Sequence, residues 1–211
     1  MVFNAIIATV IAYLLGSIPS AYIAGRLKKG VDVRQVGGGN IGALNTLREI
    51  GLLPGLAVLI ADIAKGSFAV LIALWFDLSL IWIFIAGFAA VVGHNWPVFL
   101  KFKGGKGAAT TIGVLLALVP REFAISLAII LAIIIITSNV RFAMIIGLAL
   151  SPLIIWQLNG SIMLITYSVA LFLFLAFRSL PSTREALSNI SDKKSLIFDR
   201  KYHFWQTKKS K

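Results

Sequence analysis

The sequence predicts an all-α protein, a polytopic membrane helix bundle of about seven transmembrane helices. Of its 211 residues, 59% are hydrophobic and 13% are charged, and the mean hydropathy is +0.93. A chain of this size cannot bury so much apolar surface inside a water-soluble globule, so its solvent must be lipid. The apolar stretches also follow one another too closely for a separate folded domain, which indicates a single bundle.

The helices are expected in the long charge-free stretches. These stretches cover residues 2–25, 66–76, 78–100, 107–120, 123–140 and 142–177. The last is too long for one crossing, because about 20 residues rising ~1.5 Å each span a ~30 Å hydrocarbon core. We therefore expect two helices there, with the turn at Asn159-Gly160. The stretch 107–120 is short, which leaves a tilted span or a re-entrant segment, and hence five spans as the alternative to seven.

The basic residues predict the orientation of the bundle. With the amino terminus outside, the inner loops and the carboxyl-terminal tail hold nearly all of the 20 lysines and arginines. Only Arg121 falls in an outer loop, and Lys65 lies within a span. Because basic loops stay in the cytoplasm, the carboxyl terminus is expected to be cytoplasmic. We divide the chain into a transmembrane bundle (1–178) and a basic cytoplasmic tail (179–211), mostly unstructured or lying on the membrane surface.

The composition also excludes several classes of function. The chain has no cysteine, so it has no disulfide, no thiolate nucleophile and no cysteine-ligated metal. Its two histidines, His94 and His203, lie far apart, and no acidic pair stands at ligand spacing, so we expect no metal and no cofactor. The net charge of +12 fits the topology and anionic headgroups better than nucleic acid, because no basic and aromatic surface exists outside the tail.

A glycine-rich basic segment supplies the first candidate site. We call residues 103–107 the second glycine loop; its candidate residues are Lys103, Gly104, Gly105, Lys106 and Gly107. Glycines let backbone N–H groups approach a ligand, and a helix is expected to begin just after the loop. Amides, a helix amino terminus and lysines together predict a phosphate-binding loop, although it lacks the Walker spacing. The alternative is a basic turn that only anchors the membrane interface.

A similar segment, the first glycine loop (residues 37–42), supplies the other half of the site. Its candidate residues, with those just after it, are Gly37, Gly39, Asn40, Asn45 and Arg48. The loop holds more glycines than one turn needs, and an arginine can clamp a phosphate through a bidentate fork. The alternative is a flexible connector with a headgroup-facing arginine. We expect the two glycine loops to meet at the inner water boundary and to grip doubly anionic groups.

Three polar features within the spans complete the set of candidates. Asp62 and Lys65 are three residues apart, so they share one helix face and are expected to pair toward the bundle interior, in a structural or a catalytic role. Residues 16–19 (GSIP) are expected to kink the first helix, with Ser17 or its neighbours re-satisfying the freed carbonyl. His94 is either an acid or base for the site or part of a helix-end turn.

These motifs together resemble the PlsY family, the integral-membrane glycerol-3-phosphate acyltransferases that use acyl-phosphate donors. The resemblance covers most of the chain from Gly16 to about Phe177. The residues that carry it are GSIP at 16–19, VGGGNIGALN at 36–45 followed by Arg48, Asp62 with Lys65-Gly66, and Gly93-His94 through FKGGKG at 102–107.

The resemblance implies a reaction, its partners and a place in the cell. The reaction is transfer of a fatty acyl group from acyl phosphate to the 1-position of glycerol 3-phosphate, giving lysophosphatidic acid in phospholipid synthesis. The expected setting is the bacterial inner membrane, with a monomer in contact with membrane lipids and an active site facing the cytoplasm. The implied roles are phosphate neutralisation by Arg48 and Lys106, orientation of substrate by Asn40 and Asn45, and a donor-phosphate loop of Gly104, Gly105 and Gly107.

The chain departs from the family pattern at two motifs. Gly38 stands where the first motif usually has serine, and residues 178–182 read RSLPS where the third motif resembles HRENI. The alternative function is therefore a catalytically impaired paralogue that binds lipid phosphates or a partner enzyme without turnover. A third hypothesis, a small anion or lipid-phosphate transporter, predicts inverted repeats and a polar midplane path, and the sequence shows neither beyond Asp62 and Lys65.

Overall fold

The computed structural model describes residues 1–188 of the chain, and their side chains as far as residue 181. Within this part every regular element is a helix, as predicted. The chain forms two compact units, one from Met1 to Pro120 and one that begins at Arg121. Each unit is described by itself below.

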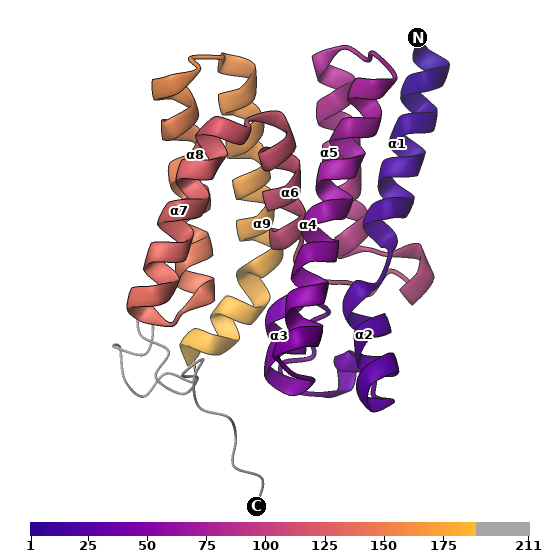
Figure 1. The fold of residues 1–211 in the computed structure, drawn as a ribbon, viewed down its shortest axis with the longest axis vertical. Coiled ribbons are helices and arrows are strands. Elements are labelled where there is room, and N and C mark those ends of the chain that lie inside the picture. Colours follow the sequence, from indigo (N-terminus) through magenta and orange to yellow (C-terminus); the bar gives the residue numbers. More distant parts are fainter. Residues whose placement is uncertain (189–211) are drawn as a thin grey trace, which may run out of the picture. The chain divides into compact units, whose positions relative to one another are not determined.

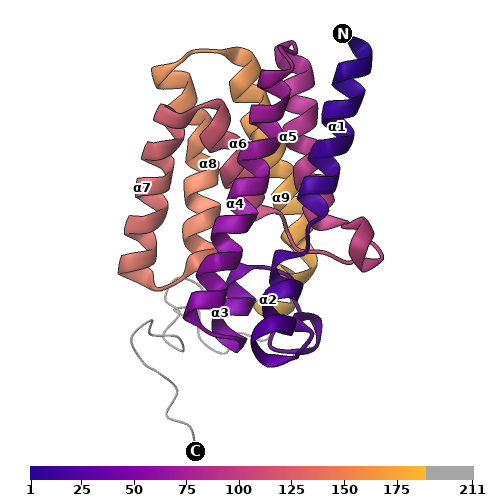
Figure 2. The ribbon, with the colours of Figure 1, turned by 45° about the vertical axis from the view of Figure 1, so that its right-hand side comes forward.

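The first unit is built on three long helices. Its α-helices are α1 (Val2–Ser17), α2 (Ser20–Lys29), α3 (Ala43–Glu49), α4 (Leu52–Trp75), α5 (Leu80–Asn95) and α6 (Ala108–Leu118), with short 3-10 turns at Val33–Gln35 and Val98–Leu100. Helices α1, α4 and α5 lie side by side (Figures 1 and 2). Helices α2 and α3 lie near the end of α4 at which that helix begins, on the opposite side of the unit from the first residue of the chain. That end also carries the first glycine loop.

The second unit consists of α7 (Pro120–Thr137), α8 (Val140–Leu158) and α9 (Ile162–Ser188). The predicted turn between the last two helices is confirmed at Asn159-Gly160, where Gly160 has a φ of +72°. Helix α9 continues to Ser188, so the first ten residues of the predicted tail, 179–188, extend the last helix. The rest of the predicted tail lies outside the described residues.

Six helices of the described chain are long and apolar enough to cross a membrane, which supports a multi-pass membrane protein. They are Val2–Lys29, Leu52–Trp75, Leu80–Leu100, Pro120–Thr137, Val140–Leu158 and Ile162–Pro181. The short segment predicted at 107–120 forms α6, whose 11 residues rise roughly 16 Å, about half of a hydrocarbon core. Helix α6 is covered by α4, as protein-shielded short segments require.

Glycines let α1 and α5 approach closely, and this contact fixes the carboxyl-terminal end of α5. A Cβ atom at Gly16 would collide with the backbone of Ala90, and one at Gly93 would collide with the backbone of Tyr13. The hydroxyl of Tyr13 also donates a hydrogen bond to the carbonyl of Trp96 at 2.8 Å. Small residues at helix crossings are typical of membrane bundles, because they replace bulky side chains by backbone contact.

The crossing of α4 and α6 uses the same device. A Cβ atom at Gly66 would collide with the backbone of Thr110, and one at Gly113 would collide with the backbone of Ile63. The hydroxyl of Ser67 donates to the carbonyl of Gly113 at 2.8 Å. The start of α6, just after the second glycine loop, is therefore held against the middle of α4.

Candidate functional site

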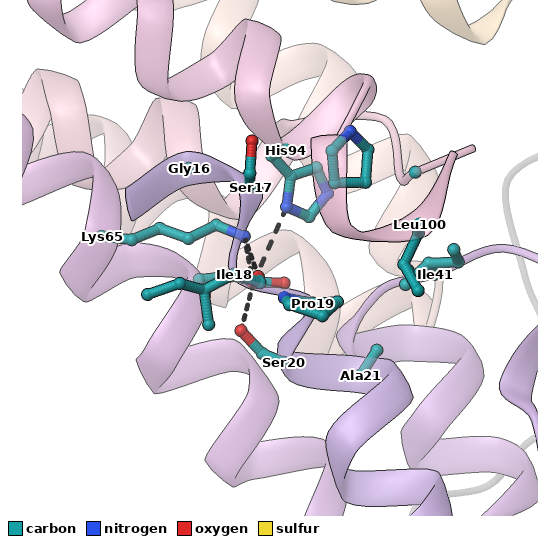
Figure 3. A pocket seen from close by; sticks show the side chains of 13 residues that line it. Gly16, Ser17, Ile18, Pro19, Ser20, Ala21, Ile41, Lys65, His94 and Leu100 are labelled. Carbon is teal, nitrogen blue, oxygen red and sulfur yellow. Dashed lines mark hydrogen bonds and ion pairs between the residues drawn. The ribbon is translucent and has the colours of Figure 1, made fainter. Parts of the chain in front are cut away.

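A buried ion pair on α4 lies at the centre of the first unit's polar residues. Asp62 and Lys65 are 2% and 6% exposed, and the Lys65 Nζ lies 2.9 Å from the Asp62 Oδ1. The hydroxyl of Ser20, at the start of α2, donates to the same oxygen at 3.0 Å (Figure 3). The predicted interior pairing of Asp62 with Lys65 is confirmed. It satisfies both charges, which would otherwise be costly in this apolar surrounding.

The first membrane helix is interrupted at the predicted motif, and Lys65 satisfies part of the break. Helix α1 ends at Ser17, and α2 begins at Ser20 after Pro19. The Lys65 Nζ donates to the carbonyl of Ile18 at 3.3 Å. Pro19 frees the carbonyl of Leu15, four residues earlier, and the N–H of Ile18 donates to it at 3.2 Å. The expectation that Ser17 or a neighbour re-satisfies this carbonyl is thus confirmed for a neighbour, without the Ser17 side chain. Its buried hydroxyl has no hydrogen-bond partner within the described part of the chain.

His94 lies between the ion pair and the second glycine loop. Its imidazole is buried, and the Nδ1 is 3.7 Å from the Asp62 Oδ1, longer than a direct hydrogen bond (Figure 3). On its other side, a Cβ atom at Gly105 would collide with the Nε2. The backbone carbonyl of His94 accepts a hydrogen bond from the Gly105 N–H at 3.0 Å. His94 is thus part of the helix end and also contacts the ion pair, and a role as acid or base stays a prediction.

The second glycine loop needs its glycines for close contact with the end of α5. A Cβ atom at Gly104 would collide with the carbonyl of His94, and Gly107 has a φ of +85° beside the Asn95 side chain. Helix α6 begins at Ala108, immediately after the loop, as predicted. The amide of Gly105 is used by His94, so it is not among the N–H groups left for a phosphate. Of the two lysines, Lys103 is exposed and Lys106 is half-buried.

Asn45 holds the first glycine loop together. Its Nδ2 donates to the carbonyls of Val33 and Val36, each at 3.1 Å. Its Oδ1 accepts the N–H of Gly38, also at 3.1 Å. Both donors of the side chain are therefore engaged by the loop, and one lone pair of the Oδ1 is left for any substrate. Orientation of substrate by Asn45 stays a prediction, and the loop contacts give it a structural role that the sequence did not indicate.

The remaining candidates of the first glycine loop are on or beside its surface. Gly37 and Gly39 have φ angles of +57° and +65°, a region that favours glycine. The half-buried amide of Asn40 makes no side-chain hydrogen bond within residues 1–188, so its donors and acceptor remain available. Arg48 is half-buried on α3, which packs against α4 where Leu47 meets Gly55.

The two glycine loops meet, as expected. A Cβ atom at Gly105 would lie 2.5 Å from the carbonyl oxygen of Ile41, so the two backbones are in contact. The side chain of Ile41 also belongs to a buried cluster that contains Leu100 and Val33. Segments more than 50 residues apart in the sequence therefore form one surface around the ion pair.

A small pocket lies between these segments. Its lining includes Ser17, Ile18, Asp62, Lys65, His94 and Gly104 (Figure 3). Its volume of about 10 Å³ is roughly the space that one water molecule needs. A glycerol phosphate is larger than this space, so the pocket as it stands does not by itself form a substrate site.

A second ion pair, which the sequence analysis did not single out, stabilises the approach to the first glycine loop. The Arg34 guanidinium contacts the Asp32 carboxylate at 2.6 Å, and this hydrogen-bonded contact lowers the pKa of Asp32 below its usual value. The guanidinium groups of Arg34 and Arg26 lie 5.4 Å and 5.3 Å from the ring centre of Tyr22. The sequence contained a signal for this pair. An aspartate side chain can accept a hydrogen bond from the backbone N–H two residues later, as Asp32 does from Arg34, and the D-x-R spacing indicates such a turn.

Comparison with known proteins identifies the family of this chain. The family model described as "Glycerol-3-phosphate acyltransferase" matches residues 6–187. The chain belongs to this family. The matched residues include both glycine loops, the ion pair and His94, so the predicted membership of the PlsY family is confirmed.

Relatives within the acyltransferase family match along nearly the whole chain. The sequence is 41% identical to glycerol-3-phosphate acyltransferase 1 of Dehalococcoides mccartyi, over 90% of this chain and 94% of that protein. It is 39% identical to the glycerol-3-phosphate acyltransferase of Endomicrobium trichonymphae, over 93% and 98% of the two chains. These names support an acyltransferase.

Solved structures of PlsY, an integral membrane glycerol 3-phosphate acyltransferase, share the fold. The glycerol 3-phosphate form has a TM-score of 0.80 at 33% identity and covers 87% of this chain and 92% of its own. The lysophosphatidic acid form has a TM-score of 0.78 at 32% identity, with the same coverage. The all-helical acyltransferase fold predicted from the sequence is therefore confirmed.

Proposed function

We propose that the protein transfers a fatty acyl group from acyl phosphate to the 1-hydroxyl of glycerol 3-phosphate, giving lysophosphatidic acid. The observation that carries this proposal is the contact between the two glycine loops at Ile41 and Gly105. It forms one surface that carries Lys103, Lys106 and the amide of Asn40, in a chain whose relatives are glycerol-3-phosphate acyltransferases. Both proposed substrates are phosphates, which cations and backbone amides bind.

The proposed chemistry makes modest demands on the protein. The 1-hydroxyl oxygen attacks the acyl carbonyl carbon, the new ester bond forms, and the bond from that carbon to the phosphate oxygen breaks. Phosphate leaves with the bonding electrons, and a substrate phosphate takes the hydroxyl proton. Because an acyl phosphate is an activated mixed anhydride, positioning and charge neutralisation matter more than a strong base.

The proposed roles are those that the family resemblance implies, and the positions of several side chains support them. Lys106 and Arg48 neutralise the phosphate groups, and Asn40, whose amide has no side-chain partner in the described chain, orients the glycerol phosphate. The second glycine loop and the first turn of α6 receive the donor phosphate, because unpaired N–H groups at a helix start favour anions. The basic loops favour a site facing the cytoplasm, in a bacterial inner membrane.

One observation favours a second function, binding of lipid phosphates without turnover. Gly38 stands where the first motif of the family usually has a serine, and RSLPS at 178–182 stands where the third motif resembles HRENI. The chain nevertheless has the loop contacts through Asn45 and His94. These contacts support phosphate binding even where groups of the family pattern are lacking.

A single assay separates the two functions. Purified protein in lipid nanodiscs is incubated with an acyl phosphate and glycerol 3-phosphate, and lysophosphatidic acid is measured by mass spectrometry. Omission of glycerol 3-phosphate controls for hydrolysis, and an acyl thioester in place of acyl phosphate tests the donor. With glycerol 3-phosphate present, we expect product when the donor is acyl phosphate and none when it is the thioester. Lys106→Ala should reduce product formation roughly 10²-fold. No product from the wild type would overturn the proposed function, and retained glycerol 3-phosphate binding would then support the second.

A further inference from the structure

One carboxylate oxygen joins three helices of the first unit. The Asp62 Oδ1 accepts a hydrogen bond from Ser20 on α2 at 3.0 Å and from Lys65 on α4 at 2.9 Å. The same oxygen lies 3.7 Å from the Nδ1 of His94 on α5 (Figure 3). A simple ion pair needs only Lys65, so the contacts with α2 and α5 require a further explanation.

The contact with α5 leads directly to the second glycine loop. The His94 imidazole fills the space between Asp62 and Gly105, where no Cβ atom fits. The carbonyl of His94 accepts the Gly105 N–H. Any rotation of the imidazole away from Asp62 therefore changes the surface against which Gly105 packs. Gly105 directly precedes Lys106, so the change reaches the lysine.

We propose that Asp62 is a positioning residue for the second glycine loop, acting through His94 on the placement of Lys106. The inference rests on the proposed function, because the loop is taken as the site of phosphate binding. We place Asp62 behind the loop and not against the substrate, because the pocket beside it has room for about one water molecule. Its role is to hold one orientation of the imidazole and so one geometry of the loop.

An ion-pair role alone predicts a different behaviour. If Asp62 served only to neutralise Lys65, removing both charges together would be harmless, because buried ion pairs are often replaceable by apolar residues of similar size. The double variant Asp62→Asn/Lys65→Met leaves no unpaired charge in the interior. If Asp62 positions His94, this double variant still has a displaced loop.

The activity test uses a matched control in the same helical hairpin. Asp77 is exposed in the turn after α4, so Asp77→Asn makes the same chemical change away from the site. We expect Asp62→Asn and the double variant to lower kcat/KM on the order of 10- to 100-fold, with a raised KM for the phosphate substrates. Asp77→Asn should match the wild type. Full activity in the folded double variant would overturn the proposal.

A second readout does not depend on turnover. The chain has no cysteine, so Lys101→Cys, at an exposed position two residues before the loop, takes one nitroxide spin label. We expect the label's spectrum to become more mobile in Asp62→Asn and in the double variant, and to stay unchanged in Asp77→Asn. An unchanged spectrum in the Asp62 variants would overturn the positioning role. If the wild type had no turnover but the label still became more mobile in the Asp62 variants, only the proposed function would be overturned.

His94 supplies the last discrimination. In His94→Asn the side-chain nitrogen can stand where the Nδ1 stands, facing Asp62, whereas in His94→Gln it stands nearer the Nε2 position, facing Gly105. We expect the label's spectrum in His94→Asn to stay closer to that of the wild type than in His94→Gln. The reverse order would contradict a connection through the Nδ1.

Discussion

Gly105 lies against His94 on two sides, with its N–H donated to the histidine carbonyl at 3.0 Å and its α-carbon facing the imidazole without room for a side chain. Because the carbonyl of Ile41 closes the third side, the first glycine loop also depends on this contact. The smallest residue at position 105 is thus a condition for the two loops to meet.

Gly105→Ala is expected to separate the loops. The added methyl group collides with the His94 Nε2 and the Ile41 carbonyl, and a shift of about 1 Å in the loop should lower turnover roughly 10²-fold. Steady-state kinetics of lysophosphatidic acid formation measure the effect. Lys101→Ala, at an exposed position of the same segment, is the control and should behave as wild type.

Gly38→Ser is expected to raise activity. A Cβ atom at Gly38 meets no atom within 4 Å, so the backbone and its surroundings accept a serine without strain. The new hydroxyl restores the residue of the family pattern and adds a hydrogen bond to a charged substrate, worth about 1.5–3 kcal/mol or roughly 10-fold or more in kcat/KM. Gly38→Ala, which fills the space without the hydroxyl, is the matched comparison. Equal rates for the two variants would contradict a role for the hydroxyl.

Asn45→Asp is expected to loosen the first glycine loop. The carboxylate still accepts the Gly38 N–H, but it cannot donate to the carbonyls of Val33 and Val36. Leaving a buried acceptor without its donor costs about 1–3 kcal/mol. Thermal unfolding in detergent should show a lower midpoint than for Gln35→Glu, the same change of charge at an exposed neighbouring position. An unchanged midpoint would show that the loop is held by other contacts.

The Asp32–Arg34 pair predicts a pH dependence of stability. Arg34 lowers the pKa of Asp32 below the usual 3.8, so the folded state favours the ionised carboxylate. The resulting stabilisation is fully present above that value and is lost as the pH falls below it. Asp32→Asn should therefore lower the unfolding midpoint at pH 7, and the difference from wild type should shrink when both are measured at pH 3. A difference that persists at pH 3 would assign the effect to hydrogen bonding alone.

The sequence was sufficient for much of the fold, because lipid imposes simple rules on a chain. Apolar stretches predicted the long helices, and Asn159-Gly160 predicted the turn between α8 and α9. The three-residue spacing of Asp62 and Lys65 predicted their contact, since residues so spaced share a helix face. The helix from Leu80 and the short α6 also followed from hydropathy and glycine placement.

Contacts between distant segments could not be predicted in this way. Nothing in the local sequence indicates that Lys65 donates to the Ile18 carbonyl in addition to the N–H of Ser20, because the lysine comes from another helix. The contact of His94 with Asp62 likewise depends on how α4 and α5 pack. The family resemblance implied that Asn45 orients substrate, and the local sequence did not indicate that both of its donors bond to the carbonyls of Val33 and Val36.

The Lys65–Ile18 hydrogen bond has a consequence for biogenesis. The first interrupted helix is synthesised, and can enter the translocation machinery, before Lys65 exists as part of the nascent polypeptide. Until α4 arrives, the Ile18 carbonyl has the N–H of Ser20 as its partner, and only water or lipid headgroups can stand in for Lys65, since hydrocarbon offers no donor. During early insertion the amino-terminal segment therefore lacks its hydrogen bond from Lys65, and the insertion of α4 supplies it.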